Sequence, residues 1–195
     1  MDRGTFFAPG GGLASAHAGY EHRPGQEEMA QAVAKVLDQG GTLMVEAGTG
    51  TGKTFAYLIP ILESGRRVIV STGTRNLQDQ IFRKDLPFLR DEAGLAVSAC
   101  MMKGRDNYLC RYRFAQFEQE PLIEVREERR FIPVLSRWSR ETGSGDRAEV
   151  AELPDDLRLW RDVNARADTC TGSKCPEYEM CWLTKVKRQA QQAQI

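Results

Sequence analysis

Apolar positions between residues 25 and 99 alternate between helical spacing and short continuous runs. Intervals of three and four residues predict a first amphipathic helix, with apolar positions at Met29, Ala32, Val33, Val36 and Leu37. Further helices are predicted from about Lys53 and from Asn76 to Leu89, and three buried strands at 42–47, 67–71 and 95–99. Because helices and strands alternate in this order, the fold class predicted is α/β, with a parallel sheet covered by helices.

The pattern changes on both sides of this region. The first 22 residues are rich in Gly and Ala without periodicity, and they predict a flexible arm. After Cys100 the chain is strongly charged, with helical stretches at 118–138 and 157–167 and no further clear strand. A domain boundary is therefore expected near Cys100, with a mainly helical segment after it.

Composition limits the expected cellular location and the expected kind of cysteine site more than it limits the function. Basic and acidic residues number 27 each, so any affinity for nucleic acid must come from local arrangement and not from a net basic field. No apolar run has the length of a membrane span and the N-terminus has no signal-peptide pattern, so a cytoplasmic protein without membrane contact is expected. Five cysteines in a reducing compartment favour metal binding over disulfides.

A phosphate-binding loop follows the first predicted strand directly and leads into a helix. Such a loop binds phosphates through backbone N–H groups and the helix N-terminus. Lys53 is expected to reach the β- and γ-phosphates of ATP, and the Thr54 hydroxyl is expected to ligate Mg²⁺. The residues of this Walker A pattern are Ala47, Gly48, Thr49, Gly50, Thr51, Gly52, Lys53 and Thr54.

Two polar segments flank this loop in the sequence. Gln26, at the start of the first helix, can form paired hydrogen bonds to adenine, although a glutamine there is usually only solvated. Ser71 to Gln80 follows the second strand with hydroxyls and amides suited to the phosphates of DNA, with candidates Thr72, Thr74 and Asn76. A polar turn that caps a helix explains the second segment equally well.

Four of the five cysteines form the candidate metal site. Cys170, Cys175 and Cys181 have the spacing C-x4-C-x5-C, and Cys110 is remote from them. Three clustered thiolates and one distant thiolate suit a [4Fe-4S] cluster better than zinc, which favours two tight pairs, but zinc and unrelated buried cysteines remain alternatives. Cys100 lies outside the pattern and is expected to be a buried apolar thiol.

Basic and aromatic residues alternate around the first of these cysteines, between Lys103 and Phe114. This mixture can contact phosphates and stack on the bases of a single strand. The candidates for DNA contact are Lys103, Arg105, Tyr108, Arg111 and Arg113. An equally weighted alternative is that the arginines are solvated and the aromatic residues support the cysteine site.

Four segments together carry a family resemblance that covers nearly all of the chain beyond the arm. They are Arg23-Pro24-Gly25-Gln26, Glu46 to Thr54, Ser71 to Gln80, and Gly104 to Cys110 with the three clustered cysteines. In order and spacing they resemble the XPD-like iron-sulfur helicases of superfamily 2, most of all the bacterial DinG and YoaA branch.

The resemblance implies a RecA-like motor domain with an iron-sulfur insertion, and 5′ to 3′ translocation on single-stranded or forked DNA. It also implies ATP-driven unwinding in DNA repair or replication stress, beside replication or repair proteins in the bacterial cytoplasm and nucleoid, with Gln26 at adenine. The expected organisation is an arm at 1–22, the first part of the motor domain at 23–99, the cluster domain at 100–185 and the start of a return to the motor domain at 186–195.

One family feature is missing from the sequence. Asp91-Glu92-Ala93-Gly94 superficially resembles the Asp-Glu-Ala-His box but follows a helix end, not a strand, and no second motor domain is seen. The chain alone is therefore expected to be inactive in hydrolysis. The rival interpretations are a non-catalytic DNA-binding or regulatory module on a nucleotide-binding fold, and a P-loop NTPase with a structural zinc.

Overall fold

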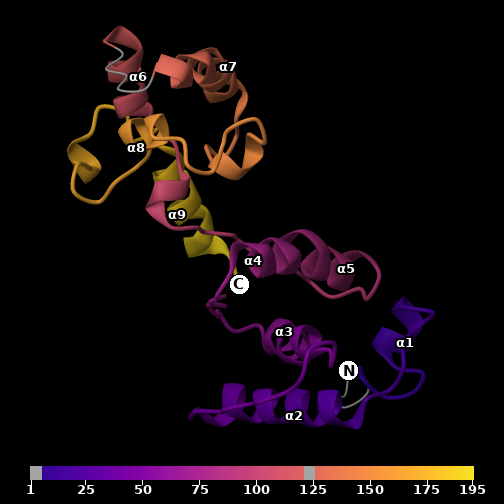
Figure 1. The fold of residues 1–195 in the computed structure, drawn as a ribbon. Coiled ribbons are helices and arrows are strands. Elements are labelled where there is room, and N and C mark those ends of the chain that lie inside the picture. Colours follow the sequence, from indigo (N-terminus) through magenta and orange to yellow (C-terminus); the bar gives the residue numbers. More distant parts are fainter. Residues whose placement is uncertain (1–5, 121–125) are drawn as a thin grey trace. The chain divides into compact units, whose positions relative to one another are not determined.

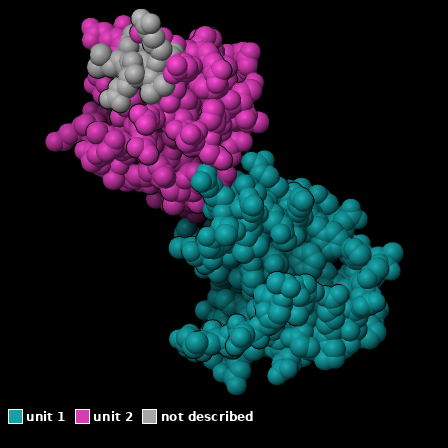
Figure 2. All heavy atoms as spheres, in the orientation of Figure 1, with its two compact units in different colours: residues 1–101, 193–195 teal, residues 102–192 magenta. Residues whose placement is uncertain are grey.

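The computed structural model describes residues 6–120 and 126–195, and the chain divides into two compact units. The first unit comprises residues 1–101 with 193–195, and the second comprises residues 102–192 (Figure 2). The division near residue 101 is close to the change in sequence character at Cys100. Within the described ranges, no helix has the length and apolar character needed to cross a membrane.

Helices provide the regular structure of the first unit (Figure 1). They are α1 (Gly12–Ala16), α2 (Pro24–Gln39), α3 (Lys53–Ser64), α4 (Arg75–Gln80) and α5 (Leu86–Asp91), with the π-helical turn η1 (Ile81–Asp85) between the last two. Pro24 suits the first turn of α2 because its missing N–H would have no helical partner there. Gly40, with φ of 77°, ends the same helix. The predicted amphipathic helix is thereby confirmed.

The predicted helix from Asn76 to Leu89 is present but irregular. It extends through α4, η1 and α5, and the π-helical turn ends at Asp85, two residues before Pro87. Because proline has no N–H, the carbonyl of Arg83 lacks its usual helical donor, and a π-helical turn is one way to accommodate such a break.

The core of the first unit lies between these helices. α2 and α3 lie side by side (Figure 1), and Leu58, Ile59 and Leu89 are fully buried in the core. Phe7 and Leu13 join the same core, each 1% exposed. Residues 1–5 of the predicted flexible arm lie outside the described residues. From residue 6 onward the arm packs on the core through these apolar side chains. Their positions show no periodicity, so the sequence pattern did not predict this packing.

The three predicted strands run as extended segments that are not paired into a sheet. Within the described residues the only β-bridges are isolated ones in the second unit. The side chains of Met44 and Ile69 are 92% and 94% exposed, although the sequence pattern predicts that both are buried. An apolar run becomes a buried strand only where neighbouring strands and helices cover it, so the sheet is not confirmed.

The last two residues of the chain join two of these extended segments. Ile195 N–H donates to the carbonyl of Ser98 at 3.1 Å, and Cys100 N–H donates to the carbonyl of Ile195 at 2.8 Å. Gln194 accepts from Val68 N–H at 2.8 Å. Donors and acceptors that alternate around residue 99 in this way follow the pattern of a parallel pair.

The second unit combines four α-helices with short 3₁₀ turns in its described part. The α-helices are α6 (Arg111–Gln119), α7 (Ile132–Glu141), α8 (Leu159–Val163) and α9 (Trp182–Gln192). The 3₁₀ turns are η2 (Arg105–Asn107), η3 (Arg126–Phe131), η4 (Arg147–Glu149) and η5 (Gly172–Lys174). Its core is aromatic, with Phe114, Trp138, Trp160 and Trp182 buried around Leu135 and Val163. The mainly helical character predicted for this segment is confirmed.

A short extended segment, residues 108–110, runs through the middle of this unit. Leu109 N–H donates to the carbonyl of Gly145 at 2.9 Å, and Cys110 N–H donates to the carbonyl of Val163 at 2.8 Å. Isolated bridges join Tyr108 to Asp146 and Leu109 to Asn164. The segment that carries the first predicted ligand cysteine is thus fixed by backbone hydrogen bonds on both sides.

Candidate nucleotide site and cysteine site

The glycine-rich loop ends at Lys53, the first residue of α3. Lys53 Nζ donates to the carbonyl oxygen of Ala47 at 2.8 Å and also to that of Gly48, and Thr51 Oγ1 donates to Gly48 O at 3.0 Å. These bonds close the loop around the start of a 12-residue helix, whose N-terminal N–H groups and dipole favour an anion.

Two side chains from the start of α2 hold the loop from outside. Arg23 Nη1 donates to the carbonyl of Gly50, and Gln26 Nε2 donates to the carbonyl of Gly52 at 2.9 Å. Both glycines have positive φ, 74° and 80°, which favours glycine over other residues. A Cβ on Gly52 would lie 2.1 Å from Gln26 Nε2, so Gln26, itself only 7% exposed, fixes how close the loop approaches α2.

A pocket of about 840 Å³ lies between the start of α2, the extended residues 43–47 and the loop. The predicted ATP-binding residues that line it are Gln26, Ala47, Thr49, Gly50, Thr51 and Lys53. Its volume is within the range usual for small-molecule and cofactor sites. The structure therefore brings the residue expected at adenine and the phosphate loop into one pocket.

Thr54, the predicted magnesium ligand, interacts with the next turn of α3. Burial holds the pKa of the Tyr57 phenol above its ordinary value, and a side-chain hydrogen bond with Thr54 partly offsets this rise. The Thr54 hydroxyl therefore has a defined neighbour within its own helix.

In the segment Ser71 to Gln80, two hydroxyls support the local backbone. Thr74 Oγ1 accepts from Leu77 N–H at 3.2 Å and caps α4, and Thr72 Oγ1 donates to the carbonyl of Thr74 at 3.2 Å. Asn76 is exposed in the first turn of α4. These contacts are those of a polar turn that caps a helix, which was the alternative to a DNA-contacting segment.

Three of the four predicted ligand cysteines share one neighbourhood. Burial raises the pKa of the Cys110 thiol, and the nearby thiols of Cys181 and Cys175 raise it further, while backbone N–H groups lower it. Cys110 and Cys181 also pack against the same small apolar cluster, which comprises Tyr108, Ala165 and Leu183. Cys170 is exposed on the loop that follows Ala165.

The four thiols do not form a closed ligand set in this structure. All four cysteines are free, and no group of three or more His, Cys, Asp or Glu side chains in the described ranges is arranged to hold a metal ion. Metal binding and local folding are coupled at thiolate sites, because protonated thiols have no attraction that draws them to ligand distances. The chemistry of the donor set nevertheless fits an iron-sulfur cluster, which is bound by four cysteines.

The segment before Cys110 has one exposed basic residue and one buried one. Arg105, in η2, is exposed to solvent. Lys103 and Tyr108 are only 7% and 3% exposed. Lys103 Nζ lies 2.7 Å from the carboxylate of Asp146, so this ammonium is engaged inside the unit.

The two arginines after Cys110 also contact their own unit. Arg111 Nε donates to the Glu177 carboxylate at 3.1 Å, and the Arg111 guanidinium lies 4.9 Å from the ring centroid of Trp182. Arg113 donates to the carbonyls of Asn164 and Arg161, each at 3.2 Å. Arg111 thus links the first cysteine segment to the loop between Cys175 and Cys181 and to the start of α9.

Sequence reasoning missed the residues that organise this neighbourhood. Asp146 and Glu177 supply the carboxylates for Lys103 and Arg111, and their partners are remote in sequence. Gly145 has φ of 67°, and a Cβ there would lie 2.5 Å from the Trp182 ring. A tryptophan directly after Cys181 was the one signal that could have drawn attention to this packing.

Gly145→Ala is expected to destabilise the second unit by about 1–3 kcal/mol, because the methyl group would overlap the buried Trp182 ring at a left-handed backbone position. Denaturant unfolding followed by tryptophan fluorescence measures this change. Gly143→Ala is the matched control, since a Cβ at Gly143 meets nothing within 4 Å. Equal stability of the two variants would contradict the packing described.

Comparison with known proteins agrees with the nucleotide site. Residues 23–142 match the DEAD/DEAH box helicase family. The chain is 38% identical to the ATP-dependent DNA helicase YoaA of Escherichia coli and 36% identical to that of Haemophilus influenzae, covering 97% and 98% of this chain and 30% of each relative. It is 35% identical to the ATP-dependent helicase DinG of Mycobacterium tuberculosis over 94% of this chain and 31% of that protein. The chain spans about a third of the length of these relatives, and it belongs to the DEAD/DEAH box helicase family, as a relative of its YoaA and DinG members.

Proposed function

We propose that this chain provides the ATP-binding part of a DNA helicase that unwinds DNA in the 5′ to 3′ direction. The proposal that the chain binds ATP rests on the pocket, which is lined both by Gln26 and by the loop that ends at Lys53. ATP binds there with Mg²⁺, the loop N–H groups and Lys53 hold its phosphates, and Thr54 ligates the metal. The relatives named as ATP-dependent helicases support the coupling of this site to unwinding.

DNA repair or replication stress is the proposed setting, with single-stranded or forked DNA as substrate and replication or repair proteins as partners. The bacterial relatives support a place in the cytoplasm, at the nucleoid. Of the candidate DNA contacts in the second unit, Arg105 is the strongest, because it is exposed, whereas Lys103, Arg111 and Arg113 are engaged inside the unit. In the first unit, Asn76 and the helix-capping Thr74 are exposed candidates, and Thr72 is partly exposed.

The four cysteines are proposed to hold a [4Fe-4S] cluster. Cys110, Cys175 and Cys181 already share one neighbourhood, and Cys170 completes the set from an exposed loop. When bound, the cluster supplies a rigid cross-link between segments that are remote in sequence. We also propose the domain organisation expected from the sequence. It comprises an arm at 1–22, whose described part packs on the core of the first unit, motor residues 23–99, a cluster domain at 100–185 and a return to the motor domain at 186–195.

Unwinding of short duplexes with a single-stranded tail tests this function on the complete protein. Duplexes with a 5′ tail are expected to be separated in the presence of ATP and Mg²⁺, and those with a 3′ tail are not. Separation that requires the 3′ tail would contradict the proposed polarity. DNA binding with no ATP hydrolysis would support the rival interpretation of a non-catalytic module. One zinc per chain together with DNA-independent hydrolysis would support the other rival, a P-loop NTPase with a structural zinc.

Gln26→Ala is expected to lower the preference for ATP over GTP by about 1–3 kcal/mol, the size of one paired amide contact to a base edge. Binding of fluorescent ATP and GTP analogues measures the ratio, which separates the effect on the base from any effect on the loop. Gln31→Ala, on the exposed side of the same helix, is the control. An unchanged ratio in Gln26→Ala would rule out adenine recognition by this side chain.

A further inference from the structure

The ion pair between Lys103 and Asp146 is the most deeply buried one described in the second unit. Their side chains are 2% and 9% exposed, and Lys103 Nζ lies 2.7 Å from Asp146 Oδ2. Asp146 Oδ1 accepts from Ala148 N–H at 3.0 Å, so both carboxylate oxygens are engaged. Because leaving one charge of a buried pair without its partner is strongly unfavourable, this contact fixes the two segments relative to each other.

On one side the pair organises the residues that lead to Cys110. Lys103 N–H donates to the Tyr108 hydroxyl at 3.0 Å, and Tyr108 is bridged to Asp146. The next residue, Leu109, donates its N–H to the carbonyl of Gly145 at 2.9 Å. Three successive contacts therefore connect the ion pair to the backbone directly before Cys110.

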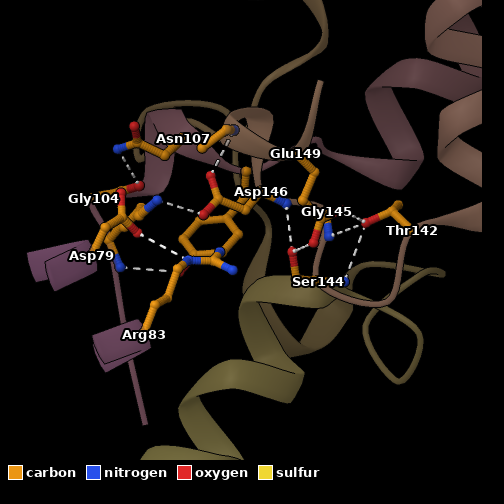
Figure 3. A network of polar contacts seen from close by, with 12 residues as sticks. Asp79, Arg83, Gly104, Asn107, Thr142, Ser144, Gly145, Asp146 and Glu149 are labelled. Carbon is orange, nitrogen blue, oxygen red and sulfur yellow. Dashed lines mark hydrogen bonds and ion pairs between the residues drawn. The ribbon is translucent and has the colours of Figure 1, made fainter. Parts of the chain in front are cut away.

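On the other side the pair organises the turn that supports Cys181. Figure 3 shows Asp146 beside a polar network in which Thr142 and Ser144 donate to the Glu149 carboxylate. Thr142 Oγ1 also accepts from Gly145 N–H at 2.8 Å. Gly145 in turn packs against the ring of Trp182, the residue after Cys181, so closely that a Cβ would overlap it.

We propose that the Lys103–Asp146 pair is a positioning element that holds Cys110 and Cys181 within reach of each other. This inference rests on the proposed cysteine site, and it assigns Lys103 a role inside the unit instead of at DNA. The two residues act through the Tyr108–Leu109 segment and through the Gly145–Trp182 contact, which reach the two cysteines from separate parts of the chain.

Two single variants and their combination test the proposal in the complete protein. Lys103→Met keeps the aliphatic stem and removes the charge, and Asp146→Asn keeps the oxygen that accepts from Ala148. The measurements are iron and acid-labile sulfide per chain, the electron paramagnetic resonance spectrum of the reduced protein, and, after chelation, the yield of a short bismaleimide cross-link between Cys110 and Cys181. Lys187→Met, an exposed lysine on α9, is the control.

Each single variant is expected to lose cluster content and cross-link yield several-fold and to alter the spectrum of any remaining cluster, while the control does not. The double variant should lose no more than the worse single one, because both remove the same interaction. Undiminished content, spectrum and cross-linking in Asp146→Asn would overturn the inference even if Lys103→Met failed to fold. A native protein without iron and sulfide would refute the proposed cluster instead, and cross-linking would still decide the role of the pair.

Discussion

Lys53→Ala is expected to lower ATP hydrolysis by the complete protein at least about 100-fold, the usual cost of removing one charged or hydrogen-bonding group that stabilises a transition state. Lys53 Nζ donates to the carbonyls of Ala47 and Gly48 in its own loop. In the proposed nucleotide complex, phosphate oxygens would replace these carbonyls as stronger, charged acceptors. An alanine offers no donor to the phosphates, so turnover falls while the core of the first unit is untouched.

Steady-state hydrolysis with saturating DNA, together with thermal unfolding, checks this expectation. Lys35→Ala is a suitable control, because Lys35 is an exposed lysine on α2 that does not line the pocket. Unchanged turnover in Lys53→Ala would refute the assignment of the loop. A matching loss of thermal stability would show that Lys53 acts through the fold and not on the nucleotide.

The backbone of the glycine-rich loop was largely predictable from the sequence because its determinants are local. Positive φ at Gly50 and Gly52 and a helix that starts at Lys53 follow from residues that are neighbours in the chain. The contact of Gln26 with the loop was harder to predict from the sequence. It depends on how α2 packs against α3, a relation that periodicity does not encode, and it buries the Gln26 side chain against the loop.

The sheet was the least predictable part of the fold. Val68 and Ser98 belong to runs that read as buried strands, but strand pairing is a contact between remote segments. In this structure the partner of both runs is residues 194–195, which the sequence analysis placed at the start of a return to the motor domain. The exposed Met44 and Ile69 show that an apolar run specifies a tendency to be buried and not the neighbour that buries it.

The second unit illustrates a different limit. Alternating basic and aromatic residues around Cys110 suggested a surface for DNA, yet the structure gives most of these side chains partners within the unit. Arg111 bonds Glu177, and Lys103 bonds Asp146 across more than forty residues of sequence. A cation in a sequence does not reveal whether its counter-charge is a phosphate or a carboxylate, so only Arg105 keeps the expected exposure.

Cys110→Ser is expected to remove most of the cluster and the unwinding activity while leaving ATP binding within about twofold of the native value, a difference below about 0.5 kcal/mol. Serine nearly matches cysteine in size, but its hydroxyl stays protonated at neutral pH and cannot replace a thiolate ligand. The backbone of residue 110 is held by Val163 whatever its side chain, so the loss concerns the ligand and not the segment. Iron, sulfide and zinc per chain, nucleotide affinity and strand separation are the measurements.

Cys100→Ser provides the matched control, because Cys100 belongs to the first unit and lies outside the ligand spacing. It should keep both the cluster and unwinding. Since the phosphate loop and Cys110 belong to different compact units, a ligand variant that lost nucleotide binding as well would show that the cluster stabilises the whole chain. A Cys110→Ser protein that unwound DNA normally without iron would contradict a role of the cluster cross-link in unwinding. One zinc per native chain would replace the proposed cluster with a structural metal site.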